Sequence, residues 1–192
     1  PEVVLTSFSG VRPLHADAAA DASAASRDYW LVLDAPSGGA PLLSVLGGKI
    51  TTYRRLAQEA IDRLSPYLKP PRAGHWTAAA PLPGGDMKDG DFVASLHGLR
   101  GAYPWLDEER AMRLARAYGT RAKRILGEAK GVSELGRDFG AGLSQAEIGY
   151  MIDCEFAHSS EDILWRRSKL GLHLSATEKA CVEAYVAERT NA

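Results

Sequence analysis

Cysteine is scarce in this chain of 192 residues, with Cys154 and Cys181 the two examples. Both lie in segments with helical periodicity and neither has metal-ligand spacing, so we expect buried free thiols in a reducing compartment. No apolar run of about 18 residues is present, so the sequence predicts no membrane-spanning helix. The net charge of −1 provides no basic face for nucleic acid, which we exclude as a partner.

Metal-binding patterns and a signal peptide are also missing. The histidines, among them His75, His97, His158 and His173, have no i, i+4 pairing and no carboxylate at metal spacing, so no metal site is predicted. The chain begins at Pro1–Leu5 without an initiator methionine, and this apolar start is unlike a secretion signal. We therefore expect a piece of a longer protein.

The composition is that of a soluble globular protein, with 45% hydrophobic and 24% charged residues. The chain is organised around a predicted strand, glycine turn and helix. Leu42–Leu46 is an apolar run that we expect to be a buried strand, and Gly47-Gly48 follows it, where the backbone can take unusual dihedral angles or approach a ligand closely. Thr51 or Thr52 is the candidate N-cap of the helix. One apolar face is expected on that helix, made of Tyr53, Leu56, Ala57, Ala60, Ile61 and Leu64.

This junction has the chemistry of an anion site. The first N–H groups of a helix carry roughly half a positive charge, and Lys49 adds a mobile cation, so the corner favours an anion or an electron-rich carbonyl. A phosphate-binding P-loop is rejected, because it needs a glycine at position 43 and a hydroxyl at position 50, where the chain has Leu43 and Ile50. The alternative is a tight connection whose glycines serve packing alone.

Upstream of this junction, Val3–Phe8 has strand composition, and Arg12 follows it in a turn stiffened by Pro13. A guanidinium held there is suited to fork-like contact with a phosphate or a carboxylate, and a surface ion pair is the alternative. Residues 15–26 read as a surface loop. Residues 27–33 have strand composition and are predicted to form a hairpin with Leu42–Leu46.

The second half of the chain reads as helices. Phe92, Leu96 and Leu99 share one expected apolar face, and Ala111, Ala115 and Tyr118 share another.

Two capping boxes, Ser144-x-x-Glu147 and Ser175-x-x-Glu178, mark helix starts. The apolar residues expected to follow them are Ile148, Met151, Ile152 and Phe156 after the first box, and Val182, Tyr185 and Val186 after the second.

A further helix is predicted over Asp162–Lys169, ending at Gly171. We expect Trp165 in the core, with Arg166 and Arg167 paired to nearby acids such as Glu161 and Asp162. The carboxylates of this half are expected to be spread over helix surfaces, with no acid–base pair among them.

Several motifs together resemble the FAD-dependent glycerol-3-phosphate dehydrogenases. They are residues 9–14 (SGVRPL), 27–29 (RDY), 47–54 (GGKITTYR), 132–136 (VSELG) and 162–172 (DILWRRSKLGL). Their order matches the last part of the family's length, so the resemblance implies a C-terminal fragment. The implied fold class is α+β: the last strands and helix of an FAD-binding domain at residues 1–70, a linker at 71–90, and an all-helical domain at 91–192.

The resemblance also implies an activity and the residues that carry it. The parent enzyme would oxidise sn-glycerol 3-phosphate to dihydroxyacetone phosphate, pass a hydride to FAD and deliver electrons to a quinone. Arg12 and Lys49 would be the catalytic residues, and Gly47, Gly48, Lys49, Ile50 and Thr51 would bind the cofactor. The family fingerprint for the FAD pyrophosphate and the catalytic base are absent from these residues, so the chain alone is expected to be inactive.

The sequence leaves four questions open. An oxidase that uses oxygen shares the architecture, and the helical half alternatively serves as a non-catalytic interaction module. A cytoplasmic location is expected, with peripheral association on the cytoplasmic face of the inner membrane and a homodimer both left open.

Overall fold

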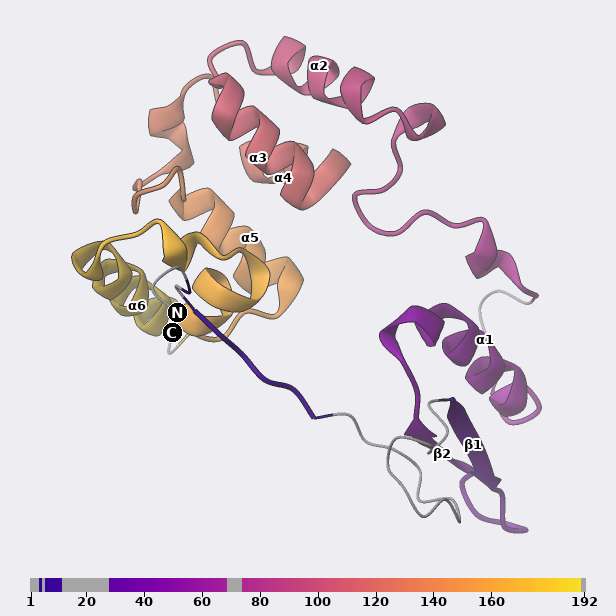
Figure 1. Ribbon diagram of the computed structural model, residues 1–192. Helices are drawn as coiled ribbons and strands as arrows, with labels where there is room; N and C mark the ends of the chain where they lie inside the picture. Colours follow the sequence, from indigo (N-terminus) through magenta and orange to yellow (C-terminus); the bar gives the residue numbers. More distant parts are fainter. Residues whose placement is uncertain (1–3, 5, 12–27, 69–73, 191–192) are drawn as a thin grey trace. The chain divides into compact units, whose positions relative to one another are not determined.

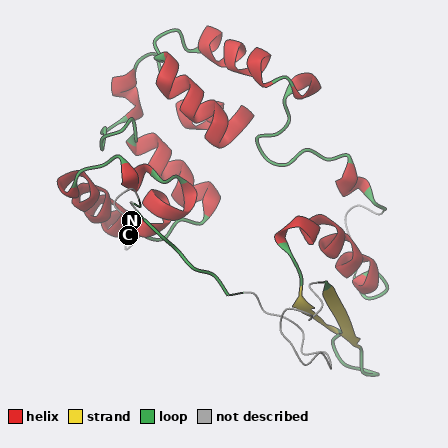
Figure 2. Cartoon of the chain, viewed as in Figure 1, coloured by secondary structure: helices red, strands yellow, loops and turns green. Residues whose placement is uncertain are grey.

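The computed structural model describes residues 4, 6–11, 28–68 and 74–190, and the structural statements below concern these residues. They form helices and one two-stranded sheet, so the predicted α+β class is confirmed (Figures 1 and 2). The chain divides into two compact units, residues 1–80 and 81–192. This division falls inside the stretch 71–90 that the sequence predicts as a linker.

The first unit contains a hairpin and one helix. Strand β1 (Tyr29–Asp34) pairs antiparallel with strand β2 (Leu42–Gly47), and Tyr29 lies opposite Gly47. A 3₁₀ turn at Ile50–Thr52 leads into helix α1 (Tyr53–Leu64). The predicted hairpin and helix are therefore confirmed, and a further 3₁₀ turn lies at Trp76–Ala78.

Two expectations for this unit are wrong. The described residues of the predicted strand Val3–Phe8 (Val4 and 6–8) have no strand conformation, because a strand needs a hydrogen-bonded neighbour and the described sheet consists of β1 and β2 alone. No residue of β2 is buried, and Leu42 is 63% exposed. A two-stranded sheet beside one helix has too little cover to bury a strand on both faces.

The second unit is helical, as the sequence predicts. Its α-helices are α2 (Phe92–Ala102), α3 (Glu108–Tyr118), α4 (Ala122–Leu126), α5 (Gln145–Glu155) and α6 (Ala176–Thr190). Short 3₁₀ turns lie at Lys88–Gly90, Gly119–Arg121, Val132–Leu135 and Leu170–Leu172. The segment predicted as a helix over Asp162–Lys169 is a π-helical turn over Asp162–Arg167, and Lys169 after it takes a left-handed conformation.

The helices of this unit enclose one hydrophobic core. The predicted inward faces of α2 and α3 are confirmed: Leu96, Leu99, Ala111, Ala115 and Tyr118 are all buried. The largest fully buried apolar side chains are Leu114, Leu126, Leu143, Ile148, Met151, Ile163, Val182 and Val186.

Three residues of this unit lie further out than predicted. Phe156 was expected on the apolar face of α5, but the helix ends at Glu155 and Phe156 turns away in a left-handed conformation, 80% exposed. Cys154, on the outward side of the last turn of α5, is exposed, and Cys181 is half-buried. The expectation of two buried thiols is therefore wrong.

The two predicted capping boxes have different structures. In the second box Ser175 Oγ accepts from the Glu178 N–H at 3.3 Å, and the Glu178 carboxylate accepts from the Ser175 N–H at 2.7 Å. In the first, Ser144 Oγ accepts from the Glu147 N–H at 3.3 Å, but the Glu147 carboxylate is directed into the protein. The helix start is correctly predicted in both cases, and the role of Glu147 is not.

Candidate active site

The corner between β2 and α1 has the backbone shape that its sequence predicts. Gly47 and Gly48 have φ angles of 71° and 102°, values that side-chain-bearing residues rarely adopt. Lys49 is extended and opens the 3₁₀ turn. A Cβ added to Gly48 would lie 3.4 Å from both Leu56 Cδ1 and Tyr29 Cβ, so glycine also allows the strand and the helix to pack closely here.

The outer side of the corner is open. Lys49 and Thr51 are exposed, and Ile50 is 85% exposed. Thr52 occupies the predicted N-cap position, yet its hydroxyl donates to the Lys49 carbonyl at 3.0 Å and does not cap α1. The N–H groups at the start of this turn therefore lie beside an exposed cation and an exposed apolar side chain, a combination that suits a flat ligand with electron-rich oxygens.

The predicted site residues do not all lie in the described part of the chain. Gly47, Gly48, Lys49, Ile50 and Thr51 are contiguous at the corner. Arg12 lies outside the described residues, as does the loop predicted at 15–26. The assignment of these six residues to catalysis and cofactor binding stays a prediction.

A polar network next to the corner was missed by the sequence reasoning. The Tyr29 hydroxyl donates to Glu59 Oε2 at 2.9 Å, and Arg63 Nη2 donates to Glu59 Oε1 at 2.9 Å. The hydrogen bond to Glu59 raises the pKa of Tyr29, and the bonds from Tyr29 and Arg63 lower the pKa of Glu59. The spacing of Glu59 and Arg63 on one helix face is the signal that could have suggested their pairing.

A cavity of about 350 Å³ adjoins this network. It is lined by Asp28, Tyr29, Trp30, Leu31, Thr52, Arg55, Glu59 and Arg63. Its polar walls carry charges of both signs, so it does not by itself indicate the sign of a ligand.

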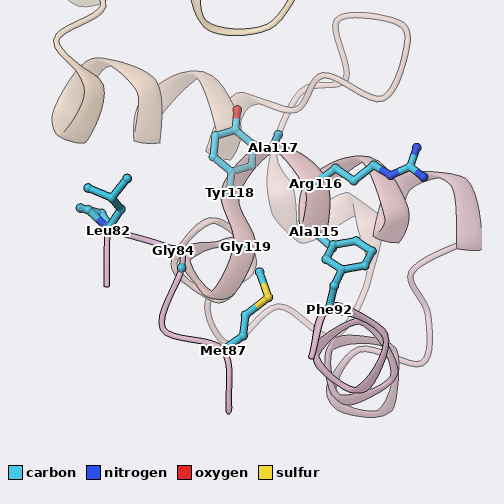
Figure 3. A pocket seen from close by; sticks show the side chains of 11 residues that line it. Leu82, Gly84, Met87, Phe92, Ala115, Arg116, Ala117, Tyr118 and Gly119 are labelled. Atoms are coloured by element: carbon cyan, nitrogen blue, oxygen red, sulfur yellow. The ribbon is translucent and has the colours of Figure 1, made fainter. Parts of the chain in front are cut away.

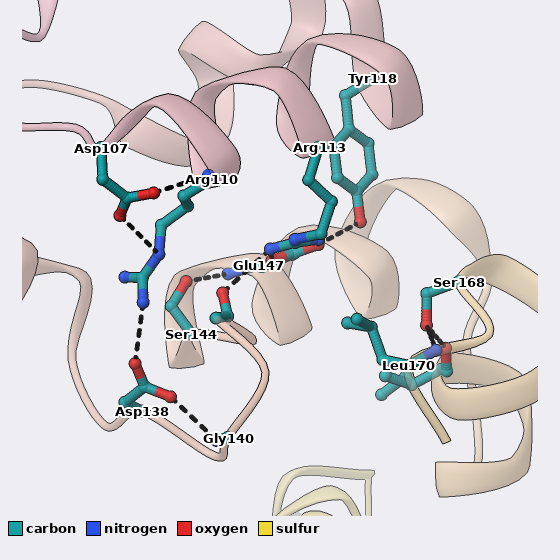
Figure 4. Close-up of polar contacts among 12 residues, drawn as sticks. Asp107, Arg110, Arg113, Tyr118, Asp138, Gly140, Ser144, Glu147, Ser168 and Leu170 are labelled. Atoms are coloured by element: carbon teal, nitrogen blue, oxygen red, sulfur yellow. Dashed lines mark hydrogen bonds and ion pairs between the residues drawn. The ribbon is translucent and has the colours of Figure 1, made fainter. Parts of the chain in front are cut away.

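In the second unit, Glu147 forms a buried cluster with two residues of α3 (Figure 4). Its side chain is 1% exposed and receives two hydrogen bonds of 2.7 Å from the Arg113 guanidinium and one of 2.8 Å from the Tyr118 hydroxyl. Burial and then the Glu147 carboxylate raise the pKa of Tyr118 far above its ordinary value. Both carboxylate oxygens are satisfied by protein groups, so the cluster joins α3 to α5 and is not available as an acid or a base.

The prediction for the segment around Trp165 is confirmed. Trp165 packs partly buried against the core, and Arg166 and Arg167 both reach Asp162 Oδ1 at 3.0 Å. Hydrogen bonds from the His158 N–H and then from Ser159 and Arg166 lower the pKa of Asp162 well below its usual value. Arg167 also donates to the Glu155 and Phe156 carbonyls, so these charges hold the π-helical turn against the end of α5.

The linker crosses the end of α3 at a pair of glycines. The Thr120 N–H donates to the Gly84 carbonyl at 3.1 Å, and a Cβ on Gly119 would overlap that same carbonyl oxygen. Figure 3 shows Gly84 beside Gly119, with Met87 and Phe92 along the cavity of about 560 Å³ that they line. This crossing fixes the start of the second unit to its core.

The described residues form neither a metal centre nor a membrane-spanning helix. No group of three or more His, Cys, Asp or Glu side chains there is arranged to hold a metal ion. Among the same residues, no helix combines the length and apolar character needed to cross a membrane.

The sequence of the helical unit matches a known protein family. Residues 75–189 match the family described as the C-terminal domain of alpha-glycerophosphate oxidase, and the chain belongs to that family. This match confirms the resemblance inferred from the motifs.

Particular relatives extend the match to nearly the whole chain. The chain is 47% identical over 183 residues to a glycerol-3-phosphate dehydrogenase of Pseudomonas aeruginosa, which covers 95% of this chain and 35% of the relative. It is 45% identical to D-erythritol 1-phosphate dehydrogenase of Brucella abortus, over 93% of this chain and 35% of the relative. It is 42% identical to the aerobic glycerol-3-phosphate dehydrogenase of Escherichia coli, over 97% of this chain and 37% of the relative. The chain thus spans about a third of the length of the curated relatives it matches.

Proposed function

We propose that the corner at Gly47–Thr51 forms part of the active site of a flavin-dependent enzyme that oxidises sn-glycerol 3-phosphate to dihydroxyacetone phosphate. The observation that carries this proposal is the corner itself: left-handed glycines, uncapped N–H groups and an exposed lysine lie together in a chain of this family. The names of the relatives support the reaction, and the corner offers N–H donors and a cation that suit it.

Each group at the corner has a role in this proposal. Bound FAD would supply the acceptor for the hydride that leaves C2 of the substrate. The N–H groups of Gly48–Thr51 would stabilise the negative charge that gathers on the flavin ring, and loss of one such donor in comparable oxyanion sites costs about 2.7–4 kcal/mol. Lys49 and Arg12 would hold the substrate phosphate dianion and polarise the hydroxyl oxygen.

The residues present fit only one edge of FAD. The exposed Ile50 and the uncapped turn suit the ring, but the chain has no glycine-rich fingerprint for the pyrophosphate and no assigned base for the hydroxyl proton. We therefore propose that the purified 192-residue chain neither retains FAD nor oxidises substrate. A stoichiometric yellow flavin in the purified chain would contradict this.

The substrate is a polyol phosphate, and two are favoured by the relatives. Glycerol 3-phosphate is the first candidate, and D-erythritol 1-phosphate is the second because a relative that is 45% identical bears that name. A protein of the relatives' length that carries this chain should be assayed with both compounds. A higher kcat/KM for the erythritol compound would replace the first candidate.

The electron acceptor is proposed to be a quinone, with molecular oxygen as the alternative. The family is named after an oxidase, whereas the three relatives above are named dehydrogenases. Oxygen uptake and quinone reduction measured on the same preparation decide between them.

Replacing Lys49 by Ala tests the site. In the full-length enzyme we expect turnover to fall at least about tenfold, because the cation that holds the substrate is removed while the fold is kept. Lys123→Ala, an exposed lysine of α4, is the matched control and should leave turnover unchanged. Equal activity of the two variants, with unchanged circular dichroism, would exclude Lys49 from the mechanism.

The helical unit is proposed to be non-catalytic, and we suggest self-association or peripheral membrane docking as its role. Its polar clusters are satisfied internally, and it has its own core. Mass measurement in solution and liposome pelleting of residues 81–192 test these roles. This span keeps Gly84 against Gly119. A monomer that does not pellet would exclude both.

A further inference from the structure

We propose that Tyr29, Glu59 and Arg63 are positioning residues that set the geometry of the Gly47–Thr51 corner. This inference rests on the proposed function for its consequence in catalysis. The claim that the three residues set the geometry of the corner rests on the structure alone, and a measurement without flavin tests it separately.

Tyr29 lies next to the two glycines of the corner. It is the first residue of β1 and lies opposite Gly47, the last residue of β2. Its Cβ lies 3.4 Å from the position that a Cβ on Gly48 would occupy. The tyrosine backbone and the first carbon of its side chain therefore pack directly against the two glycines of the corner.

The Tyr29 side chain reaches helix α1 through its hydroxyl group. Its hydroxyl donates to Glu59 Oε2 at 2.9 Å, and Glu59 lies on α1, the helix that the corner begins. Arg63, one turn further along α1, donates to the other Glu59 oxygen at 2.9 Å and to the Leu31 carbonyl of β1 at 2.8 Å. Strand and helix are thus joined at two points of β1 by one continuous set of hydrogen bonds.

Few buried apolar residues hold α1 against the hairpin. Among the described residues of the first unit, Leu31 is the buried hydrophobic residue, and α1 has no buried residue. These polar contacts therefore contribute to the angle between α1 and the hairpin, and with it to the direction of the N–H groups at the corner. A displacement of about 1 Å in such groups can cost roughly 100-fold in rate.

The charges around the network keep it intact near neutral pH. Asp28 and Arg55 also act on the Tyr29 hydroxyl, and Arg55 acts on Glu59. The Glu59 bond raises the pKa of Tyr29, and the Tyr29 and Arg63 bonds lower the pKa of Glu59, so the tyrosine stays protonated and the glutamate stays ionised.

The test in the full-length enzyme is Tyr29→Phe, which removes the hydroxyl and keeps the ring. We expect kcat to fall roughly tenfold and the flavin midpoint potential to become more negative, because the donors to the reduced ring are misplaced. KM should stay within about twofold, since Lys49 is retained. Tyr67→Phe is the control, because the described residues offer no hydrogen bond to the exposed Tyr67 hydroxyl. Identical kcat and potential in the two variants would overturn the proposal.

A second variant separates positioning from simple loss of structure. Glu59→Gln keeps an oxygen acceptor for Tyr29 and weakens the ionic bond to Arg63, so its kcat should lie between those of the wild type and Tyr29→Phe. In the double variant Tyr29→Phe/Glu59→Gln, the loss should exceed that of Tyr29→Phe alone but stay below the product of the two single losses, because both changes act on the Tyr29–Glu59 bond and Glu59→Gln also weakens the bond to Arg63. Additive losses would overturn the shared role.

A measurement without flavin distinguishes failure of this inference from failure of the proposed function. In the 192-residue chain, the amide resonances of residues 48–51 should shift in Tyr29→Phe and stay in place in Tyr67→Phe. If they shift and the full-length enzyme oxidises no polyol phosphate, the proposed function fails and the mechanical role stands. If they do not shift, the positioning role is wrong whatever the enzyme's activity.

Discussion

The two units of the chain differ in how they are held together. In the second unit, 24 buried residues from all of its α-helices and from the segments between them form one core. In the first, the described residues include Leu31 as the buried hydrophobic residue, while large apolar side chains such as Trp30, Leu42 and Ile50 remain exposed. The comparison indicates that residues 81–192 carry their own stability, whereas the hairpin and α1 depend on local polar bonds and on glycine geometry.

This difference matters for function. A short hairpin with one helix is marginally stable in water, and its candidate site is therefore sensitive to small losses of support. The helical unit can lose a surface contact with little effect, but a change within its buried polar cluster should destabilise it strongly. Substitutions at buried and exposed positions of the two units should therefore differ in their effect on stability.

The largest effect is expected for Glu147→Ala. It leaves the Arg113 guanidinium and the Tyr118 hydroxyl without their partner inside the second unit, and breaking a buried pair in this way costs about 3–5 kcal/mol. Urea unfolding should show the second unit destabilised, while the amide resonances of α1 stay unchanged.

The control for this prediction is Glu183→Ala, which removes an exposed carboxylate from α6. It should change the free energy of unfolding by less than about 0.5 kcal/mol. If Glu147→Ala is equally mild, the buried cluster does not hold α3 against α5, and the contrast between the units is weaker than the structure suggests.

A smaller effect is expected for Gly119→Ala, at the crossing of the linker and α3. The new Cβ would overlap the Gly84 carbonyl oxygen, and the residue has a φ of 56°, so a loss of about 1–3 kcal/mol is expected. Gly98→Ala, on the exposed side of α2 with open space around it, should instead stabilise by about 0.5–1 kcal/mol. Thermal unfolding of the two variants should show stability changes of opposite sign. If Gly119→Ala leaves the stability unchanged, the linker is not fixed at this crossing.

Much of the fold could be predicted from short-range chemistry. The hairpin follows from two apolar segments around a turn, and the faces of α2 and α3 follow from helical spacing. The unusual φ angles at Gly47 and Gly48 follow from two adjacent glycines between a strand and a helix. In each case the information lies within a few residues of the element that it specifies.

The features that were not predicted depend on contacts between residues that are distant in the sequence. The boxes at Ser144 and Ser175 have the same spacing, but the glutamate of the first bonds to Arg113, 34 residues away, and no local pattern shows that. The strand expected at Val3–Phe8 failed for a related reason, since its hydrogen bonds require a neighbour that local composition does not supply. For the candidate site, sequence predicted the corner, but the bracing bond from Tyr29 to Glu59 spans 30 residues and was missed.

The smallest predicted effect compares the helix starts of the two units. Ser175→Ala removes the hydroxyl that accepts from the Glu178 N–H, and loss of such a cap costs about 0.5–2 kcal/mol. Thr52→Ala should change stability by less than about 0.5 kcal/mol, because its hydroxyl donates to the Lys49 carbonyl and caps no N–H of α1. Hydrogen exchange at the first turns of α6 and α1 measures both. Equal losses at the two helices would mean that Thr52 caps α1 in solution, and the N–H groups at the corner would then be less available to a ligand than we propose.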